Sequence, residues 1–311
     1  MDRFEAMAAF VAVVQQGSFS AASRKLHMPL ASLSRRVSDL ESDLGVQLLQ
    51  RSSRSVALTN SGQQFFESCR AILEDLAEAE RTVTGEYHAP RGALVAAAQI
   101  AFGRRYMAPL VAEFLETYRE VEIELRLTGR FVDLHEESVD IALWVGPLSD
   151  AGRRRNITAI TIGTTPRIVC GAPAYLAERG TPKLLKDIVA HDCLTFSDDL
   201  GRRAYLFRVG GEQLKMPVNG RLSVNTAGAA IDAALAGAGL VQLALHAVAE
   251  EIADGRLAVV LPGFEPEPLA IMLFHRSGEP APLKIQAFVD FVVPRLKASL
   301  EAMESLARPR G

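Results

Sequence analysis

Residues Ser18–Thr59 read SFSAASRKLHMPLASLSRRVSDLESDLGVQLLQRSSRSVALT. This stretch predicts two short helices joined by a tight turn and followed by a basic hairpin. Such an order of elements allows the second helix to lie in the major groove of DNA while the hairpin, or wing, contacts the backbone. The stretch therefore predicts a winged helix-turn-helix near the start of the chain.

The second helix of this motif is expected from about residue 30 to residue 43. Its apolar residues recur at spacings of four, three and four, which predicts an inward face of Leu33, Val37, Leu40 and Leu44. Small, hydroxyl and basic side chains elsewhere on the helix allow a close approach to base edges. The predicted DNA contacts on this helix are Ala31, Ser32, Ser34, Arg35, Arg36 and Ser38. A solvated helix face is the alternative, and the basic hairpin that follows favours DNA.

The wing is expected from two strands, residues 47–50 and 55–58, joined by the sequence RSSR. Arginines at the tip of a polar hairpin suit contacts to phosphates or to the minor groove. Arg51 and Arg54 therefore complete the predicted DNA-binding set. A surface hairpin with two arginines is common, and its place directly after a helix-turn-helix makes the signal specific.

The residues around the motif predict its boundaries. Residues 3–16 form an apolar helical stripe, Gly17 ends that helix, and Ser18 or Ser20 caps the next one. His27 falls in the turn, where a positive φ is often needed and where histidine is tolerated. We favour a turn residue over a DNA contact for His27.

A long helix is expected from Thr59, a good N-cap, to about residue 84. Its apolar residues are spaced 4, 3, 4, 3 and 4, and they are Phe65, Cys69, Ile72, Leu76, Ala79 and Val83. So narrow a stripe is typical of pairing with another helix, most simply the same helix of a second copy. Packing on its own domain is the alternative, and in either case Cys69 is interpreted as a packing residue.

Beyond a linker at residues 85–92, apolar strands alternate with helices. Strands are expected at 94–98, 122–127, 139–145, 157–162, 167–171, 240–245 and 268–274, and helices at 102–118, 173–179, 226–236 and 282–303. This alternation predicts a largely parallel α/β sheet. About 220 residues of it favour two lobes with a cleft between them.

The expected domains are a DNA-binding domain at 1–59, a linker or dimerisation helix and hinge at 60–89, and an effector domain at 90–311. Within the last, lobe 1 is expected at about 90–163 and 269–311, and lobe 2 at about 164–268.

Charge is distributed unevenly along the chain. Residues 18–58 hold six Lys or Arg and three Asp or Glu, a balance of +3, whereas the whole chain of 311 residues carries −3. A basic segment on an otherwise acidic protein is typical of contact with an anionic polymer. The N-terminus lacks the features of a signal peptide, and no apolar run is typical of a membrane span. We therefore expect a cytoplasmic protein without a membrane partner.

Two other functions are alternatives for this chain. The α/β body lacks a nucleophile elbow, a phosphate loop and a metal-ligand pair, so no catalytic residue, metal or cofactor is predicted. Gly237-Ala-Gly239 is half of a dinucleotide fingerprint, but it opens a strand, and a helix-to-strand turn explains it better. A redox-responsive regulator using Cys170 and Cys193 is the remaining alternative, although buried structural thiols are the commoner outcome.

The chain resembles LysR-type transcriptional regulators along nearly its full length. The resemblance is carried by GSFSAASRKL, LSRRVSDLESDLGVQLLQRSSRSVALTNSG, VDIALWVG, VCGAPAYLAERGTP, AHDCLTF, VNTAGAAIDAALAGAGL, DGRLAVVLP and AFVDFVVPRL. It implies a winged helix-turn-helix, a dimerising linker helix and a periplasmic-binding-protein-like effector domain. It further implies a homodimer or homotetramer that binds a dyad-symmetric site on double-stranded DNA and responds to a small molecule.

The resemblance also implies where that molecule binds. Effector pockets of the family lie near the end of the first effector-domain strand and across the cleft. The corresponding positions in this sequence are Gln99, Ile100, Phe102, Thr128, Thr164 and Thr165.

Overall fold

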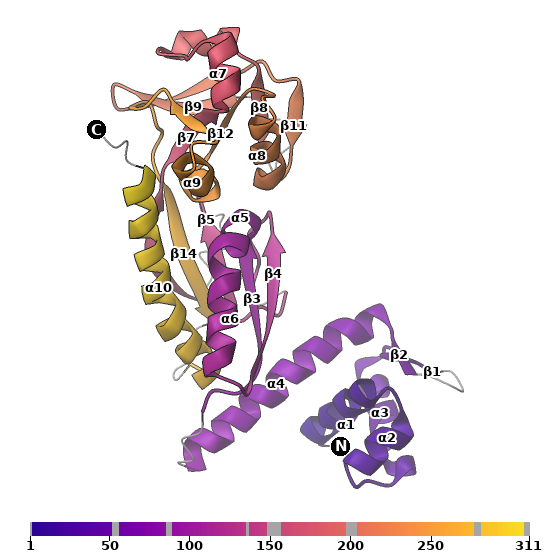
Figure 1. Ribbon diagram of the computed structural model, residues 1–311. Coiled ribbons are helices and arrows are strands. Elements are labelled where there is room, and N and C mark those ends of the chain that lie inside the picture. The colour runs from indigo at the N-terminus through magenta and orange to yellow at the C-terminus, as the bar shows by residue number, and fades with distance from the viewer. Residues whose placement is uncertain are drawn as a thin grey trace. The chain divides into compact units, whose positions relative to one another are not determined.

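A computed structural model describes residues 2–51, 56–84, 89–134, 137–147, 157–196, 204–276 and 281–307. The chain forms two compact units, Met1–His88 and Ala89–Gly311 (Figure 1). Each unit has its own apolar core.

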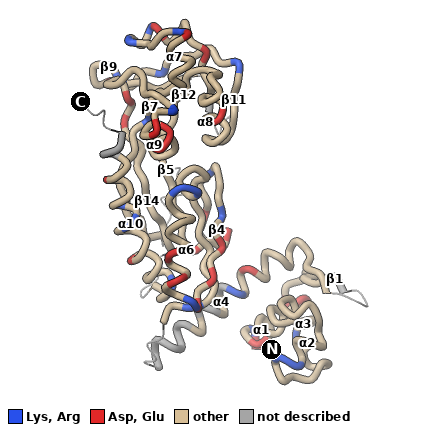
Figure 2. Tube along the Cα trace, viewed as in Figure 1, with Lys and Arg blue, Asp and Glu red and all other residues tan. Residues whose placement is uncertain are grey.

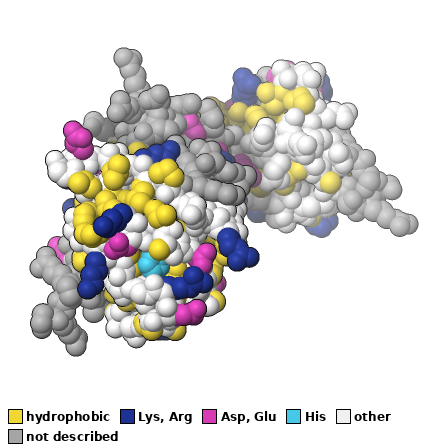
Figure 3. All heavy atoms as spheres, turned by 90° about the horizontal axis from the view of Figure 1, so that it is seen from above, with side chains coloured by type: hydrophobic (Ala, Val, Ile, Leu, Met, Phe, Trp, Pro, Cys, Tyr) yellow, Lys and Arg dark blue, Asp and Glu magenta, His cyan; other side chains and the backbone are white. Residues whose placement is uncertain are grey.

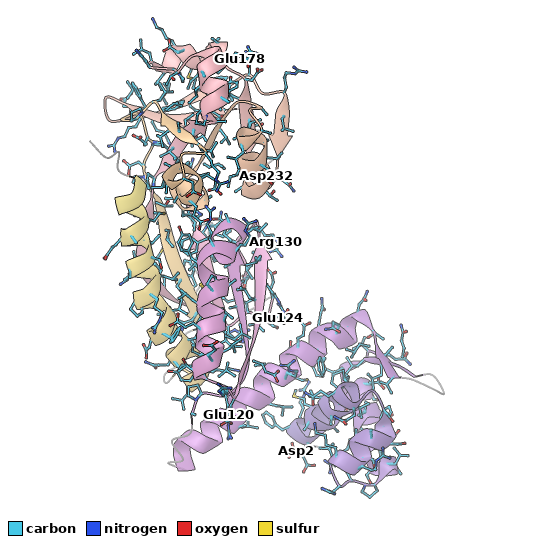
Figure 4. All side chains as sticks on the ribbon, in the orientation of Figure 1. Asp2, Glu120, Glu124, Arg130, Glu178 and Asp232 are labelled. Atoms are coloured by element: carbon cyan, nitrogen blue, oxygen red, sulfur yellow. The ribbon has the colours of Figure 1, made fainter. Side chains whose placement is uncertain are left out.

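The N-terminal unit contains the predicted motif. Its elements are α1 (Arg3–Gln16), α2 (Phe19–Lys25), α3 (Leu30–Leu44), β1 (Leu49–Arg51), β2 (Val56–Leu58) and α4 (Asn60–Thr84). Asp2, labelled in Figure 4 at the start of α1, accepts the backbone N–H of Phe4 at 2.9 Å. Gly17 ends α1 with φ 61°, and the Ser18 side chain caps α2. His27 has φ 49°, which confirms its interpretation as a turn residue.

The core of this unit shows why α3 has one free face. Leu33, Val37 and Leu40 are fully buried, as their spacing predicts. The first half of α4 packs on α1, with the Phe10 ring 5.8 Å from that of Phe65. Cys69 is fully buried in the same core. The prediction that Cys69 faces a second copy is therefore wrong, because the narrow stripe of α4 covers its own domain at this point.

Among the described residues of the C-terminal unit, two five-stranded sheets are present. The first has the order β4-β3-β5-β14-β6, from β3 (Gly92–Gln99), β4 (Val121–Thr128), β5 (Ile141–Val145), β6 (Ile157–Thr165) and β14 (Leu269–Arg276). The second has the order β11-β8-β12-β7-β13, from β7 (Arg167–Gly171), β8 (Cys193–Phe196), β11 (Leu222–Val224), β12 (Leu240–Ala244) and β13 (Ala258–Val260). We call the first sheet with its helices lobe 1 and the second lobe 2.

The prediction of a largely parallel sheet is wrong for both lobes. In lobe 1, β3 pairs in parallel with β4 and β5, whereas β14 runs antiparallel to β5 and β6. In lobe 2, β8 has two parallel partners, whereas β7 runs antiparallel to β12 and β13. The chain leaves lobe 1 through β6 and returns through β14, so these strands cannot follow a simple strand-helix-strand repeat.

Helices surround the sheets. In lobe 1, α5 (Ile100–Phe102) continues through a π-helical turn (Gly103–Met107) into α6 (Ala108–Thr117), and α10 (Leu283–Ala307) lies along the sheet (Figure 1). Lobe 2 carries α7 (Pro173–Arg179), a 3-10 helix (Leu185–Ala190), α8 (Ala227–Leu235) and α9 (Leu245–Ala253). Figure 3, viewed from above, shows apolar side chains on the face of the C-terminal unit that is turned toward the viewer. Leu184 and Val189, at the 3-10 helix, are exposed apolar residues.

Several elements of lobe 2 are absent from the sequence prediction. They are the hairpin of β9 (Ala204–Val209) and β10 (Glu212–Pro217), the strands β11 and β13, the 3-10 helix and α9. By contrast, Gly237 and Gly239 have φ of 80° and 140° between α8 and β12, which confirms the helix-to-strand turn. Among the described residues, no helix is long and apolar enough to cross a membrane.

Candidate DNA-binding face and effector cavity

The outward face of α3 presents the predicted DNA contacts. Ala31 and Ser32 are exposed, and Ser34 and Ser38 are half-buried. The Arg35 side chain is 84% exposed, with its Nε 3.9 Å from Asp39 Oδ2 one helical turn away. An exposed pair of this kind stabilises little, so Arg35 can exchange Asp39 for a base or a phosphate at low cost.

Arg36 has a different environment. Its guanidinium lies 2.5 Å from Glu5 Oε2 on α1, and its side chain is mostly covered. This ion pair joins the predicted recognition helix to the first helix of the unit. The structure therefore gives Arg36 a role in positioning α3, whereas its contact with DNA stays a prediction.

The wing is attached to α3 and α4 by two side chains. Glu41 Oε1 accepts the backbone N–H groups of Leu48 at 2.9 Å and Leu49 at 3.0 Å. Thr59 Oγ1 accepts the N–H of Gly62 at 2.9 Å and donates to the carbonyl of Gln47 at 2.8 Å. The sequence predicted the cap but not Glu41, whose partners lie seven and eight residues away and leave no local signal.

The two predicted wing arginines are only partly described. Arg51 forms the end of β1 and pairs with Val56 of β2. The Arg51 side chain and the whole of Arg54 lie outside the described residues.

A cavity of about 380 Å³ lies between the lobes of the C-terminal unit. Lobe 1 lines it with Gln99, Ile100, Ala101, Gly129, Trp144, Val145, Gly146, Pro147 and Leu269. Lobe 2 lines it with Arg167, Thr195, Ala204, Tyr205, Leu206, Lys215, Asn225, Thr226, Ala227, Gln242, Leu243, Ala244, His246 and Ala247. A cavity of this size with an apolar wall and a few polar groups is typical of a small-molecule site.

Two of the six predicted effector residues, Gln99 and Ile100, line this cavity. The other four do not. Phe102 is fully buried against Tyr106 and His246, and Thr128 pairs with Gln99 at the end of β4. Thr164 lies in β6 opposite Ala270, and Thr165 Oγ1 accepts the backbone N–H of His246 at 3.3 Å. Phe102 and Thr165 therefore contact His246, which lines the cavity. Their own role in binding stays a prediction.

The β9–β10 hairpin supplies part of the lobe 2 wall. The Gln242 amide of β12 donates to the carbonyl of Leu206 at 2.6 Å and accepts its N–H at 2.9 Å. The Tyr205 hydroxyl lies 2.7 Å from the carbonyl oxygen of Leu240. These side chains replace a backbone ladder, which explains why no sequence pattern predicted where the hairpin docks.

His246 is the titratable group at the start of α9. It is buried, and its Nδ1 has no hydrogen-bond partner. Burial, followed by the positive charge of Arg105, lowers the pKa of His246 to about 4. His246 is therefore neutral near pH 7 and adds no charge to the cavity wall.

An ion pair joins the lobes beside His246. Arg105 of the π-helical turn donates two hydrogen bonds, of 2.7 and 2.9 Å, to the carboxylate of Glu251 on α9. Figure 2 shows the acidic residues of α9 in red. The Arg105 and Glu251 side chains are 12% and 9% exposed. Burial alone would raise the pKa of the Glu251 carboxyl, but the hydrogen bond and charge of Arg105 hold that pKa below its usual value.

The cysteines are placed for packing. Burial raises the pKa of Cys170 to about 12 and that of Cys193 to about 11, far above what a reactive thiolate needs. β12 lies between their strands, since it pairs with both β7 and β8. Two strand spacings put the Cα atoms roughly 9–10 Å apart, beyond the reach of about 7 Å for a disulfide. His191, two residues before Cys193, has its Nδ1 3.1 Å from the Tyr175 hydroxyl.

Residues 4–63 match the family model described as bacterial regulatory helix-turn-helix protein, lysR family. Residues 88–297 match the model of the LysR substrate binding domain. The chain belongs to the LysR family of transcriptional regulators. The protein is thus a DNA-binding transcriptional regulator with an effector-binding domain.

Relatives of this LysR-type regulator match it over nearly their full length. It is 32% identical over 301 residues to the HTH-type transcriptional regulator CrgA of Neisseria meningitidis serogroup B, covering 95% of this chain and 98% of CrgA. It is 29% identical over 290 residues to the HTH-type transcriptional activator AaeR of Escherichia coli, covering 93% of each.

Solved structures of full-length regulators are also similar to this chain over nearly its whole length. The full-length structure of the Vibrio cholerae virulence activator AphB is similar at 27% identity and TM-score 0.59, covering 94% of this chain and 99% of that one. The structure of CrgA is similar at 29% identity and TM-score 0.60, covering 94% and 98%.

Proposed function

We propose that the outward face of α3 reads the bases of the operator, and that Arg35 is its main specificity residue. The exposed Arg35 side chain carries this proposal, because it stands on the side of α3 opposite the buried Leu33, Val37 and Leu40. A guanidinium can donate two parallel bonds to the O6 and N7 of guanine. Ala31, Ser32 and Ser34 leave room for the helix to approach.

The test is the ratio of affinities for operator and random DNA, measured by fluorescence anisotropy. Arg35→Ala is expected to reduce that ratio by about tenfold or more, since a bidentate base contact contributes roughly 1–3 kcal/mol. Arg3→Ala, which removes an exposed arginine from α1, is the matched control and should leave the ratio unchanged. An unchanged ratio for Arg35→Ala would remove Arg35 from the reading face.

We also propose that a second copy pairs through the later part of α4 and presents two recognition helices to a dyad-symmetric site. Ile72 is 42% exposed and Leu76 is half-buried in the single chain, unlike Cys69. The side chains of Ala79 and Val83 lie outside the described residues. The double variant Ile72→Glu, Leu76→Glu is expected to halve the mass measured by light scattering, whereas Gln64→Glu on the same helix keeps it.

In the proposed mechanism a small molecule enters the cavity and favours one arrangement of the lobes. It can do so only by its difference in affinity between the arrangements. The cavity contacts both lobes, which supports this role. Neither a carboxylate nor a thiol lines the cavity among the described residues, so we propose no catalytic step. As a DNA-binding regulator, the protein would act in the cytoplasm.

A further inference from the structure

One helical turn of lobe 1 departs from α-helical geometry. Between α5 and α6, the π-helical turn Gly103–Met107 ends with the N–H of Ala108 donating to the carbonyl of Gly103, five residues earlier. An α-helix uses the carbonyl four residues earlier, so this turn holds one extra residue. Single π-helical turns within α-helices are frequent at functional sites. The turn follows closely after residues 99–101, which line the cavity.

The sequence reason for the wide turn is Pro109. Proline has no N–H, and in a continuous α-helix its ring would meet the carbonyl of Arg105, four residues earlier. Because α6 begins anew at Ala108, Pro109 falls in its first turn, where an N–H is not needed. A single exposed proline therefore favours the π-helical turn over a regular α-helix.

Two side chains of the turn contact α9 of lobe 2. Arg105 donates to the carbonyl of Ala247 as well as to the Glu251 carboxylate. The Tyr106 hydroxyl lies 3.4 Å from the carbonyl oxygen of His246. Figure 1 shows α9 next to α5, where the His246 ring meets that of Phe102. Since His246 and Ala247 also line the cavity, α9 contacts both the cavity and the turn.

These contacts link the geometry of the turn to the arrangement of the lobes. In an α-helix each residue is rotated by about 100° from the one before it. A turn with one residue fewer cannot keep both Arg105 and Tyr106 pointing at α9. The contacts therefore stabilise the π-helical turn, and by linkage the turn stabilises the observed arrangement of the lobes to the same extent.

We propose that the turn Gly103–Met107 is a two-state latch between the lobes. In the observed state the turn is π-helical and Arg105 holds α9. In the second state the turn approaches α-helical geometry, Arg105 leaves Glu251, and lobe 2 is released. This proposal rests on the effector role proposed above and names the element through which an occupied cavity acts. A ligand that contacts residues 99–101 and α9 contacts both sides of the latch, and it favours the state to which it binds more tightly.

The first experiment changes lobe 1 and observes lobe 2. Pro109→Ala restores a donor for the carbonyl of Arg105 and so favours an α-helical turn. Hydrogen exchange in the full-length protein, followed by mass spectrometry, should show the amides of α9 exchanging about tenfold faster than in the natural protein, the equivalent of roughly 1.4 kcal/mol. Pro294→Ala is the matched control, because Pro294 is also exposed within a helix of lobe 1. It should leave exchange in α9 unchanged.

The second experiment changes lobe 2 and observes lobe 1. Glu251→Gln removes the charge that binds Arg105 and keeps the shape of the side chain. The amides of Gly103–Met107 should then exchange about tenfold faster, because the coupling acts in both directions. Asp254→Asn is the matched control, since Asp254 is exposed and pairs with Arg256.

Three results would overturn the latch. They are natural exchange of α9 in Pro109→Ala, exchange of the turn in Glu251→Gln equal to that in Asp254→Asn, and a uniform rise in exchange over the whole C-terminal unit. The last would mean a general loss of stability, for which exchange in β4 and α10 is the internal reference. The Tm of each variant checks folding, and Glu251→Gln decides alone should Pro109→Ala fail to fold.

Failure of the effector role gives a different result. Release of the latch should change the affinity for operator DNA by about fivefold or more in the anisotropy assay, the lower end of allosteric couplings. Coupled exchange in both variants with unchanged operator affinity would leave the latch in place and remove the control of DNA binding by the lobes.

Discussion

The outward face of α3 and the cavity of the C-terminal unit both display positive charge, but they are built differently. On α3 the arginine is exposed, and its neighbours follow one another in the sequence. Around the cavity, Arg167 and Lys215 come from separate strands, and the facing wall comes from residues as distant in the chain as Gln99 and Leu269. The comparison shows that one surface depends on a single helix, whereas the other depends on how two lobes are held together. A substitution at one of these surfaces should therefore leave the other surface unchanged.

The largest expected effect is at the ion pair between the lobes. Arg105→Ala leaves the Glu251 carboxylate buried without its bidentate partner, which is expected to lower the free energy of unfolding of the C-terminal unit by about 3–5 kcal/mol. Trp144 fluorescence in a urea titration reports this unit. Arg130→Ala is the control, because its pair with Glu137 is exposed and should contribute less than about 1 kcal/mol. Equal losses in the two variants would show that the buried pair does not hold the lobes.

The second effect concerns pH. The folded pKa of His246 is about 4 and its ordinary value is 6.5. As the pH falls from about 6.5 to about 4, the unfolded chain takes up a proton that the folded chain does not, so stability falls, by about 3 kcal/mol in total for this group. His246→Asn should remove that part of the decline in urea titrations over this pH range.

His275→Asn on β14 provides the comparison for this experiment. It should leave the steep decline between pH 6.5 and pH 4 in place. A decline of equal size in both variants would assign the acid sensitivity to other groups.

A smaller effect is expected in the N-terminal unit. Thr59→Ala removes the cap of α4 and the bond to Gln47, and should cost about 1–2 kcal/mol without changing the urea unfolding of the C-terminal unit followed by Trp144 fluorescence. Far-ultraviolet circular dichroism during thermal unfolding measures it. Thr117→Ala, at the exposed end of α6, should change little. A lower urea midpoint of the C-terminal unit in Thr59→Ala would contradict the independence of the two units.

The smallest effect is expected at the thiols. The double variant Cys170→Ala, Cys193→Ala should bind operator DNA with the same affinity before and after hydrogen peroxide, and so should the natural protein, because both thiols are buried and held too far apart for a disulfide. A peroxide response that the natural protein has and the variant lacks would revive the redox alternative.

The sequence was most informative where the signals are short-range. The caps at Ser18 and Thr59, the turn at His27 and the inward face of α3 each depend on residues within about four positions. The stripe of α4 shows the limit of this reasoning. The spacing of its apolar residues is the same whether the helix packs on a second copy or on its own domain. Only the structure shows that Cys69 is buried in the core of its own domain.

By itself, then, the sequence determined the helix-turn-helix, the inward and outward faces of α3 and the alternation of strands and helices that follows, because periodicity, caps and turn residues act locally. Only the tertiary structure decided the mixed strand order, the docking of the β9–β10 hairpin through Gln242, and which residues meet at the cavity. Gln99 and Ile100 are brought there while Thr128 and Thr164 are not, and Arg167 and Lys215 join them although no sequence pattern assigned either residue to the cavity. The reason is that pairing between distant strands depends on the packing of the whole unit, which no short window of sequence contains.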